Sequence, residues 1–309
     1  MNVVSLLPSA TEIVYALGVE PVGVSHECDH PPAAREQPAV NFSHVDPTAS
    51  AGEIDEQVLA AEADHGGVYG IHTDILDELD PDLIVTQGVC DVCAVDSVLV
   101  EEAVREIDAD PAVLTTDPHS LGDVFEDIER VGAALGREDR AEELLAALRE
   151  RTDRVSRRAS ATGDRPSVAV LDWTDPVMTA GHWVTDLVDR AGGRFEIVGP
   201  NDPSRPREWT EIRRYDPEVL VVAPCGFDLE QTARNLTDLT ERPGWDELRA
   251  VRGGRAYAVD GHHLLNRPGP RLVESLEVLA GCLHPAAFDI GERSRFVAPL
   301  SELDARVEP

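Results

Sequence analysis

The sequence contains no lysine. Arginine accounts for all 27 basic residues, against 59 acidic residues in a chain of 309, and the formal net charge is −32. Proteins bind nucleic acid and anionic membrane surfaces through clustered cations, so this balance excludes both as partners. The acidic residues are spread along the whole chain. This spread favours a solvated surface suited to high salt, and a salt-loving microbe as the source, over a site for a cationic partner.

Long apolar runs and a secretion pattern are also missing. No run of 18 apolar residues occurs, so the sequence predicts no membrane-spanning helix. A leader peptide is not recognisable, because residues 2–8 already resemble a core strand. We therefore expect a cytoplasmic protein, or an extracytoplasmic one if the true start lies upstream. The five cysteines, an odd number, do not resemble a secreted disulfide framework.

The common enzyme motifs are missing too. The sequence has no Gly-x-Ser-x-Gly, no Gly-x-x-x-x-Gly-Lys-Ser/Thr and no Gly-x-Gly-x-x-Gly. We therefore expect a binding protein without enzymatic activity and without a required cofactor. A thiol- or metal-dependent enzyme centred on Cys90 and Cys93 is the alternative.

Short apolar runs alternate with helical patterns, which predicts an α/β fold with parallel sheets. Ser9 is the expected N-cap of the first helix, in a capping box with Glu12. The expected strands are Val3–Leu7, Val22–Ser25, Leu83–Thr86, Ala112–Thr115, Ser167–Asp172, Val219–Ala223 and Ala256–Val259.

The middle of the chain has helical periodicity. Apolar residues step by three and four from Leu121 to Leu135, and Gly136 is the expected stop. A second helix is predicted from about Glu138 to Ser156, roughly 30 Å long at 1.5 Å per residue. Its polar surface favours a position between two lobes. We expect a monomer with an N-terminal lobe (1–118), a helical connector (119–163), a C-terminal lobe (164–285) and a tail (286–309).

A weak internal repeat in the sequence supports two similar lobes. Residues 79–85 and 215–221 each place Asp-Pro before an apolar strand, and a cysteine follows each strand, Cys90 in one and Cys225 in the other. Ligands of such sheets bind beyond the carboxyl ends of the strands. The loops that carry these cysteines are therefore candidates for the binding site.

An ordered set of segments resembles the cobalamin-binding branch of the ABC-transporter solute-binding proteins. The segments are residues 5–13 (SLLPSATEI), 21–25, 29–32, 179–181, 191–193 and 267–271 (RPGPR). Residues 25–29 (SHECD) and 86–94 (TQGVCDVCA) are similar to a subgroup labelled cobalamin-binding. The resemblance implies two Rossmann-like lobes joined by one long helix, with a cleft between them that closes on a corrinoid. It also implies an ABC permease as partner.

In exported relatives, a glutamate on each lobe seats on the permease. The matching positions here are Asp74 and Thr210, with Glu211 adjacent. One glutamate is replaced by the shorter aspartate, and the other is absent from its position.

Tryptophan suits a corrin ring, because it covers a broad apolar face and keeps a polar N–H. Trp173, Trp183 and Trp209 are candidates, with core packing as the alternative. Arg267 lies in a stiff proline loop and can donate to amides or phosphate, with a salt bridge as the alternative. The other expected ligand contacts are Ser9, Cys28, Asp29, Tyr69, Gln87, Cys90, Cys93, Cys225, His263 and Asn266. Another metal chelate, a siderophore or haem, is the alternative ligand.

The Cys-x-x-Cys of Cys90 and Cys93 can hold a soft metal, with Cys28 and His26 as further ligands. The alternative is buried cysteines that pack as small apolar groups. A neutral imidazole of His262 or His263 could also ligate cobalt.

Overall fold

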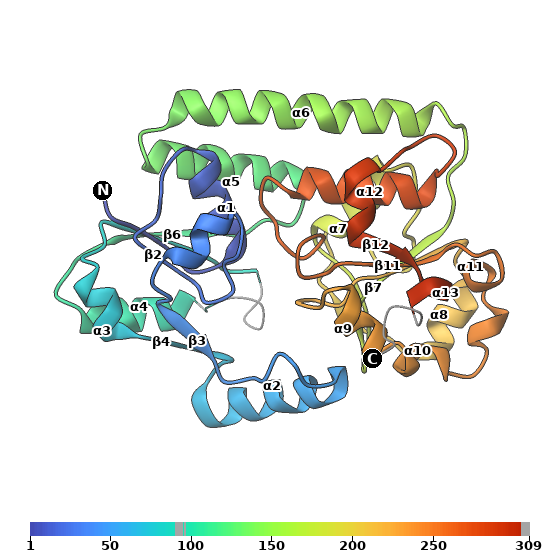
Figure 1. Ribbon diagram of the computed structural model, residues 1–309, viewed down its shortest axis with the longest axis horizontal. Coiled ribbons are helices and arrows are strands. Elements are labelled where there is room, and N and C mark those ends of the chain that lie inside the picture. The colour runs from blue at the N-terminus through green and yellow to red at the C-terminus, as the bar shows by residue number, and fades with distance from the viewer. Residues whose placement is uncertain (90–94, 96, 304–309) are drawn as a thin grey trace. The chain divides into compact units, whose positions relative to one another are not determined.

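The computed structural model describes residues 1–89, 95 and 97–303. Its contacts divide the chain into two compact units. The N-unit comprises Met1–Asp46 and Glu56–Leu148, and the C-unit comprises Pro47–Asp55 and the residues from Arg149 onward. Each unit is built from a largely parallel sheet and surrounding helices (Figure 1), so the α/β prediction is confirmed.

Four parallel strands form the sheet of the N-unit, in the order β2-β1-β5-β6. These strands are β1 (Val3–Ser5), β2 (Gly23–Val24), β5 (Leu83–Gln87) and β6 (Ala112–Thr116). All four strands expected from the sequence are present. A separate antiparallel pair consists of β3 (Asn41–Ser43) and β4 (Tyr69–Ile71).

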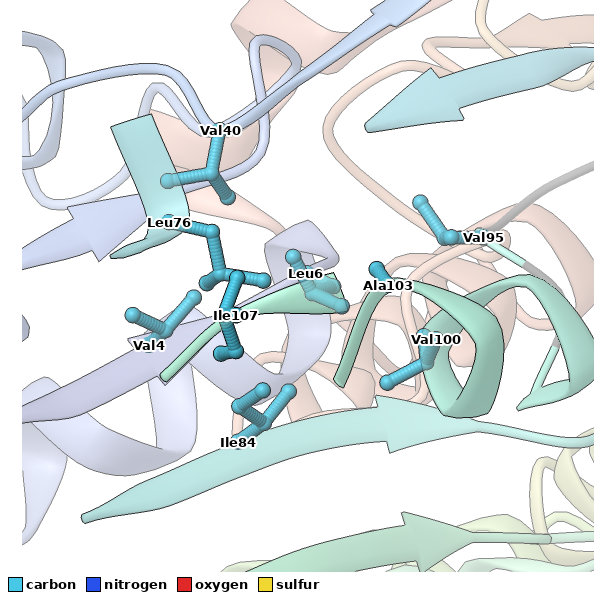
Figure 2. Close-up of a cluster of buried hydrophobic side chains, with 9 residues drawn as sticks. All are labelled: Val4, Leu6, Val40, Leu76, Ile84, Val95, Val100, Ala103 and Ile107. Atoms are coloured by element: carbon cyan, nitrogen blue, oxygen red, sulfur yellow. The ribbon is translucent and has the colours of Figure 1, made fainter. Parts of the chain in front are cut away.

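The core of the N-unit lies where β1 and β5 meet helices α3 (Thr73–Glu78) and α4 (Ser97–Glu106). Val4 and Ile84 project from the strands, and Leu76 and Val100 from the helices; all four are fully buried (Figure 2). Full burial of such a side chain contributes about 1.5–3 kcal/mol. This packing holds the carboxyl ends of the strands in fixed positions.

Helix α1 (Pro8–Ala16) begins without the expected cap. Leu7 is the N-cap, no side chain caps the helix, and Ser9 is buried within the first turn. The predicted Ser9–Glu12 capping box is therefore wrong. A proline at the first helical position suits a helix start, because its fixed φ and missing N–H cost nothing there.

The helical middle of the chain follows the sequence pattern. Helix α5 (Leu121–Ala134) is capped by Ser120, whose Oγ accepts from the Asp123 N–H at 3.2 Å. Gly136 adopts φ +63°, as a helix stop requires. Helix α6 (Glu138–Ser160) runs four residues beyond the predicted end, and the boundary between the units falls inside it, after Leu148. The remaining N-unit helices are η1 (Pro32–Glu36) and most of α2 (Ala51–His65).

Six strands form the sheet of the C-unit, in the order β12-β11-β10-β7-β8-β9. They are β7 (Val168–Thr174), β8 (Val177–Thr179), β9 (Arg205–Pro206), β10 (Val219–Val222), β11 (Ala256–Val259) and β12 (Val297–Pro299). The three central strands β7, β10 and β11 are parallel, and the outer strands are antiparallel to their neighbours. The region from residue 286, expected as a tail, supplies β12.

Helices α7 (Trp183–Arg190) and α12 (Leu272–Leu283) pack together on one side of this sheet, and α8 (Trp209–Tyr215) and α9 (Leu229–Arg234) lie on the other (Figure 1). The smaller elements are α10 (Thr237–Thr240), η2 (Trp245–Glu247), α11 (Arg249–Arg252), η3 (Gly291–Phe296) and α13 (Leu300–Leu303). Within the described ranges, no helix is both long and apolar enough to cross a bilayer.

Candidate functional site

The carboxyl ends of β7, β10 and β11 share one edge of the C-unit sheet, because the three strands are parallel. Trp173 lies near the end of β7, Cys225 follows β10, and His263 follows β11. The loops are tied to one another: the Cys225 N–H donates 3.0 Å to the main chain of β7, and Asn266 Nδ2 donates 3.2 Å to the Ala223 carbonyl. We call this surface the C-unit edge; it comprises Trp173, Cys225, His262, His263, Asn266 and Arg267.

Trp173 is partly exposed and firmly held. Its ring centroid lies 5.0 Å from that of the buried Phe227, and its Nε1 donates 3.0 Å to the Asp175 carbonyl. Phe227 is in turn tied to the next loop, because its carbonyl accepts from the His262 N–H at 3.0 Å. The indole is therefore held in place at the end of the sheet.

Two histidines follow β11 with different hydrogen-bond partners. Arg267 is 6% exposed, and its Nη2 lies 3.1 Å from His262 Nε2. Asp260 is likewise 6% exposed, and its carboxylate lies 3.0 Å from His263 Nδ1. The Asp260 carboxylate also accepts from the His263 N–H at 2.8 Å. Both imidazoles are thus positioned by buried charged side chains.

The other two candidate tryptophans lie in the interior of the C-unit. Trp183 donates from Nε1 to the Leu265 carbonyl at 2.6 Å, and Trp209 donates to the Pro243 carbonyl at 2.9 Å. Trp209 also stacks on Trp245, with ring centroids 6.1 Å apart. Both rings are more than nine-tenths buried, which is the geometry of the core-packing alternative. Ligand contact by Trp183 and Trp209 stays a prediction.

A buried carboxyl that the sequence did not single out lies beneath the C-unit edge. Asp172 is in β7, its Oδ2 accepts from the Ser204 hydroxyl, and burial raises its pKa to about 6. Its Oδ1 is buried without a hydrogen-bond partner among the described residues. Ser204 Oγ also accepts from the Gly181 N–H at 2.9 Å. No pattern in the sequence distinguishes Asp172 from the other aspartates, although the candidate Trp173 is the next residue along β7.

The parallel strands β1, β2 and β5 form a corresponding edge in the N-unit. Ser9, Asp29 and Gln87 lie at or just beyond their carboxyl ends. Gln87 is the last residue of β5 and is 6% exposed, and its Oε1 has no hydrogen-bond partner within the described part of the chain. Asp29 pairs with Arg35 at 3.6 Å. The N-unit edge therefore presents polar groups, one of them an unused amide acceptor.

Cys28 lies in the interior of the N-unit. Its residue is 4% exposed and packs with Val24 and Ala34, and its Sγ lies 3.0 Å from Thr11 Oγ1. This packing matches the alternative in which cysteine acts as a small apolar group. Cys90 and Cys93 lie outside the described residues, so the proposed metal cluster with Cys28 and His26 stays a prediction.

His26 follows β2 and is held by two neighbours. The Asn41 Oδ1 lies 2.9 Å from its main-chain N–H and 3.0 Å from its Nδ1, and Glu27 lies 3.3 Å from its Nε2. Burial lowers the pKa of His26, but the hydrogen bonds that its ring donates to Glu27 and Asn41 outweigh this effect and raise the pKa above the usual value. Metal binding by His26 stays a prediction.

Tyr69 is part of a strand. It begins β4 and pairs with Ser43, and its ring lies 5.9 Å from that of His26. Asp74 is exposed in the first turn of α3. Glu211 forms the capping box of α8 with Glu208, whose N–H donates to it at 3.1 Å. A role for Asp74 or Glu211 in permease docking stays a prediction.

The C-unit also contains a cavity of about 510 Å³ lined by Tyr257, Cys282 and Phe288, among others. Arg158 lies over the Phe288 ring at 5.1 Å. Burial raises the pKa of the Cys282 thiol to about 12, so this cysteine is a poor nucleophile at neutral pH. Tyr257 lies in the amino-terminal half of β11, whereas the C-unit edge lies beyond the strand's carboxyl end.

Comparisons with known proteins agree with this architecture. A Bacillus subtilis (strain 168) protein, the uncharacterized ABC transporter substrate-binding lipoprotein YvrC, is 26% identical over 296 residues, which cover 93% of this chain and 81% of that protein. The periplasmic heme-binding protein RhuT from Roseiflexus sp. RS-1 is 25% identical, with a TM-score of 0.68 over 93% of this chain and 98% of that one. The periplasmic vitamin B12 binding protein BtuF of Vibrio cholerae is 21% identical, with a TM-score of 0.67 over 92% and 97%.

The sequence profile of the family described as periplasmic binding protein matches residues 3–262, which span both units. The match confirms the family resemblance that the motifs indicated. The chain belongs to the periplasmic binding protein family and has its two-lobed α/β fold.

Proposed function

We propose that the protein binds a planar metal chelate, with a corrinoid as the leading ligand, and delivers it to an ABC permease. The observation that carries this proposal is the C-unit edge, where a braced indole, a thiol, two imidazoles and a buried guanidinium come together at the carboxyl ends of three parallel strands. Sheets of this kind bind ligands at that edge.

Trp173 suits the face of a macrocycle. A large flat ring gains most of its affinity from apolar contact, and an indole that is already held in place loses little entropy on binding. Its ring contact with Phe227 and its hydrogen bond to the Asp175 carbonyl provide that preorganisation. Arg267 can donate to the polar rim of the ligand, since a guanidinium carries five N–H groups.

Haem is the alternative ligand. The relatives named above include one that binds heme and one that binds vitamin B12, and both ligands are planar tetrapyrrole-type chelates. A strongly anionic iron–siderophore is disfavoured, because a chain with a net charge of −32 would repel it. The names of the relatives also favour the extracytoplasmic location over the cytoplasmic one. We place the function in binding rather than catalysis, as the family description indicates.

The direct test is a titration at high salt with cyanocobalamin, diaquocobinamide and haemin, monitored by tryptophan fluorescence and equilibrium dialysis. We expect quenching and saturable binding of at least one chelate. Trp173→Ala should weaken binding by about tenfold or more, since a stacked aromatic contributes about 1–3 kcal/mol. Phe42→Ala, which removes an aromatic side chain that is 37% exposed in the N-unit, should not change the affinity.

No saturable binding of any of the three chelates at high micromolar concentration would contradict the proposal. The enzyme alternative makes a different forecast: metal that persists through purification, or an activity that is lost in Cys90→Ser. The permease step has its own test. Charge reversal at Asp74 or Glu211 should abolish uptake while leaving chelate affinity unchanged.

A further inference from the structure

The turn that follows Trp173 controls where the indole lies. Strands β7 and β8 are joined by a short turn in which Thr174 pairs with Val177. The Trp173 Nε1 donates 3.0 Å to the carbonyl of Asp175, which lies in this turn. A side chain that fixes the turn therefore also fixes the indole.

Arg242 contacts both residues that come directly after Trp173. Its Nη2 lies 3.2 Å from Asp175 Oδ1 and donates 3.3 Å to the Thr174 carbonyl. Its Nε donates 2.6 Å to the main-chain carbonyl of Asp238, in helix α10. A guanidinium carries its donors in a rigid fork, so one side chain joins the turn to α10 in a fixed geometry.

Asp238 makes a second bond between α10 and the turn. Its Oδ2 accepts from the hydroxyl of the fully buried Thr174 at 2.9 Å. Burial and the nearby Asp175 carboxylate raise the pKa of Asp238, while the Thr174 hydroxyl and Arg242 lower it. The two acids therefore repel each other, and Arg242 is the cation that contacts both residues. Without this cation, repulsion would push the turn away from α10.

Arg242 is itself held in place. Its guanidinium lies over the buried Trp209 ring, 6.0 Å from the centroid. The Arg242 side chain is 27% exposed, against 47% for Arg234, which forms a surface ion pair within helix α9. A guanidinium that is partly buried beside a fixed ring loses less entropy in making its bonds than a surface guanidinium does.

We propose that Arg242 is a positioning residue for the ligand: it holds the turn between β7 and β8, and through the Asp175 carbonyl it holds the Trp173 indole in the orientation that the chelate meets. This inference rests on the proposed function and concerns the same site. Arg242 contributes to affinity without touching the ligand, because an indole that is already fixed loses less entropy on binding. The indole N–H is used within the protein, so Trp173 offers the ligand an apolar ring rather than a donor.

A double-mutant cycle tests whether Arg242 acts through Trp173. Cyanocobalamin, diaquocobinamide and haemin are each titrated by equilibrium dialysis into the wild type, Arg242→Gln, Trp173→Ala and the double variant. Arg242→Lys keeps the charge but not the fork. Arg234→Gln is the matched control, because the ion pair of Arg234 with Glu230 lies within α9.

We expect Arg242→Gln to weaken binding of the chelate by roughly three- to tenfold when Trp173 is present. When Trp173 is replaced by alanine, the same change should weaken binding by less than about twofold, because the residue through which Arg242 acts is gone. Arg242→Lys should give an intermediate affinity, and Arg234→Gln should bind as tightly as the wild type.

The ligand-free protein gives an independent measurement. Protein labelled with 5-fluorotryptophan has four tryptophan positions, and Trp173→Phe identifies the ¹⁹F resonance of Trp173. In Arg242→Gln this resonance should narrow and move towards that of free 5-fluorotryptophan. The resonance of Trp183, whose indole is bonded to the Leu265 carbonyl, should stay in place and so report that the variant is folded. If it moves, Arg242→Lys is judged by the same criteria.

An Arg242→Gln protein that binds the chelate as tightly as the wild type would overturn the inference. An equal loss of affinity with and without Trp173 would also overturn it, as would an unshifted Trp173 resonance. Each of these results leaves the proposed function standing, because the wild type still binds. A wild type that binds none of the three chelates contradicts the proposed function and the role of Arg242 in affinity, and the Trp173 resonance then decides alone whether Arg242 positions the indole.

Discussion

The indole nitrogen of Trp183 donates a hydrogen bond of 2.6 Å to the main-chain carbonyl of Leu265. Leu265 has φ +60°, an uncommon value for a residue with a branched side chain, and its N–H donates to Ser275 Oγ at 2.9 Å. Side chains from α7 and α12 therefore hold both polar groups of one strained residue. Because Leu265 is held in this way, the main chain that leads to Arg267, two residues further on, is also fixed in position.

Replacement of Trp183 by phenylalanine should destabilise the C-unit. The ring is largely kept, but the Leu265 carbonyl loses its donor in a buried setting, which costs about 1–3 kcal/mol. Urea denaturation followed by circular dichroism measures the change. The matched control is Trp245→Phe, at a ring that is 6% exposed and whose nitrogen makes no hydrogen bond to described residues. An equal loss in both variants would show that ring volume matters rather than the hydrogen bond.

Asp172 should make stability depend on pH. Burial raises its pKa from a usual 3.8 to about 6, so the folded protein prefers the protonated form. This contribution is fully present below about pH 4 and is lost as the pH rises through 6. Asp172→Asn cannot ionise and should therefore exceed the wild type in stability above pH 6, on the order of 2 kcal/mol, with little difference at pH 4.

Denaturant unfolding at several pH values between 4 and 8 measures this difference. Asp246→Asn, at an exposed carboxyl, is the control and should give parallel profiles. A constant offset between Asp172→Asn and the wild type across the whole range would contradict the assignment.

A fork-shaped ion pair joins α6 to α12 within the C-unit. Arg151 donates to both carboxylate oxygens of Glu277, at 3.1 and 2.8 Å, and Arg293 contacts the same carboxylate at 2.6 Å. Arg151→Ala should cost about 2 kcal/mol, because it leaves a half-buried carboxylate with one partner fewer. The surface pair Arg154–Glu150 is the control, and Arg154→Ala should cost about 0.5 kcal/mol or less. Equal shifts of the urea midpoint in the two variants would contradict the predicted difference in their stability.

Cysteine alkylation should distinguish the two described thiols of the C-unit. Cys225 is partly exposed in the loop after β10, whereas Cys282 is buried and burial raises its pKa to about 12. Iodoacetamide followed by peptide mass spectrometry should label Cys225 at least tenfold faster than Cys282. Saturating chelate should protect Cys225. Labelling of Cys225 at the same rate with and without bound chelate would place the ligand elsewhere.

Strands were the part of the fold that could be predicted best. Apolar runs such as Leu83–Val85 and Val219–Val222 are buried on both faces of a parallel sheet, so they stand out without any need for alternation. The outer strands of the C-unit were missed because they are short. Strand β12, for example, has three residues, and only its pairing with β11 defines it.

The Ser-x-x-Glu spacing alone does not predict where a helix begins. The spacing Ser-x-x-Glu occurs at Ser9 and again at Ser50. At Ser50 it forms a true box, with the Ser50 N–H 3.0 Å from Glu53 and the Glu53 N–H 3.4 Å from Ser50 Oγ, and α2 begins beside it. At Ser9 it does not, because Pro8 has already started the helix. The proline before Ser9 therefore prevents the capping box from forming at that helix start.

Much of the candidate site consists of residues whose roles leave no recognisable pattern in the sequence. The sequence indicated Trp173, His263 and Arg267, and the parallel strands bring them to one edge of the C-unit. Neither Asp260 nor Asp172 could be recognised, since an aspartate in an acidic chain carries no signal until its burial is known. The sequence did indicate Trp183 and Trp209, but it could not show that their indole nitrogens donate to main-chain carbonyls in the interior.

Gly181 shows how narrow the tolerance beneath this edge is. A Cβ atom there would come within 2.3–2.4 Å of the main chain of residues 202–204, and its N–H is the donor to Ser204. Even one methyl group would push that segment outward and move the hydroxyl away from Asp172. The pKa of Asp172 therefore depends on the absence of a side chain at position 181. A substitution of Gly181 should change the pH dependence of stability before it changes the affinity for the ligand.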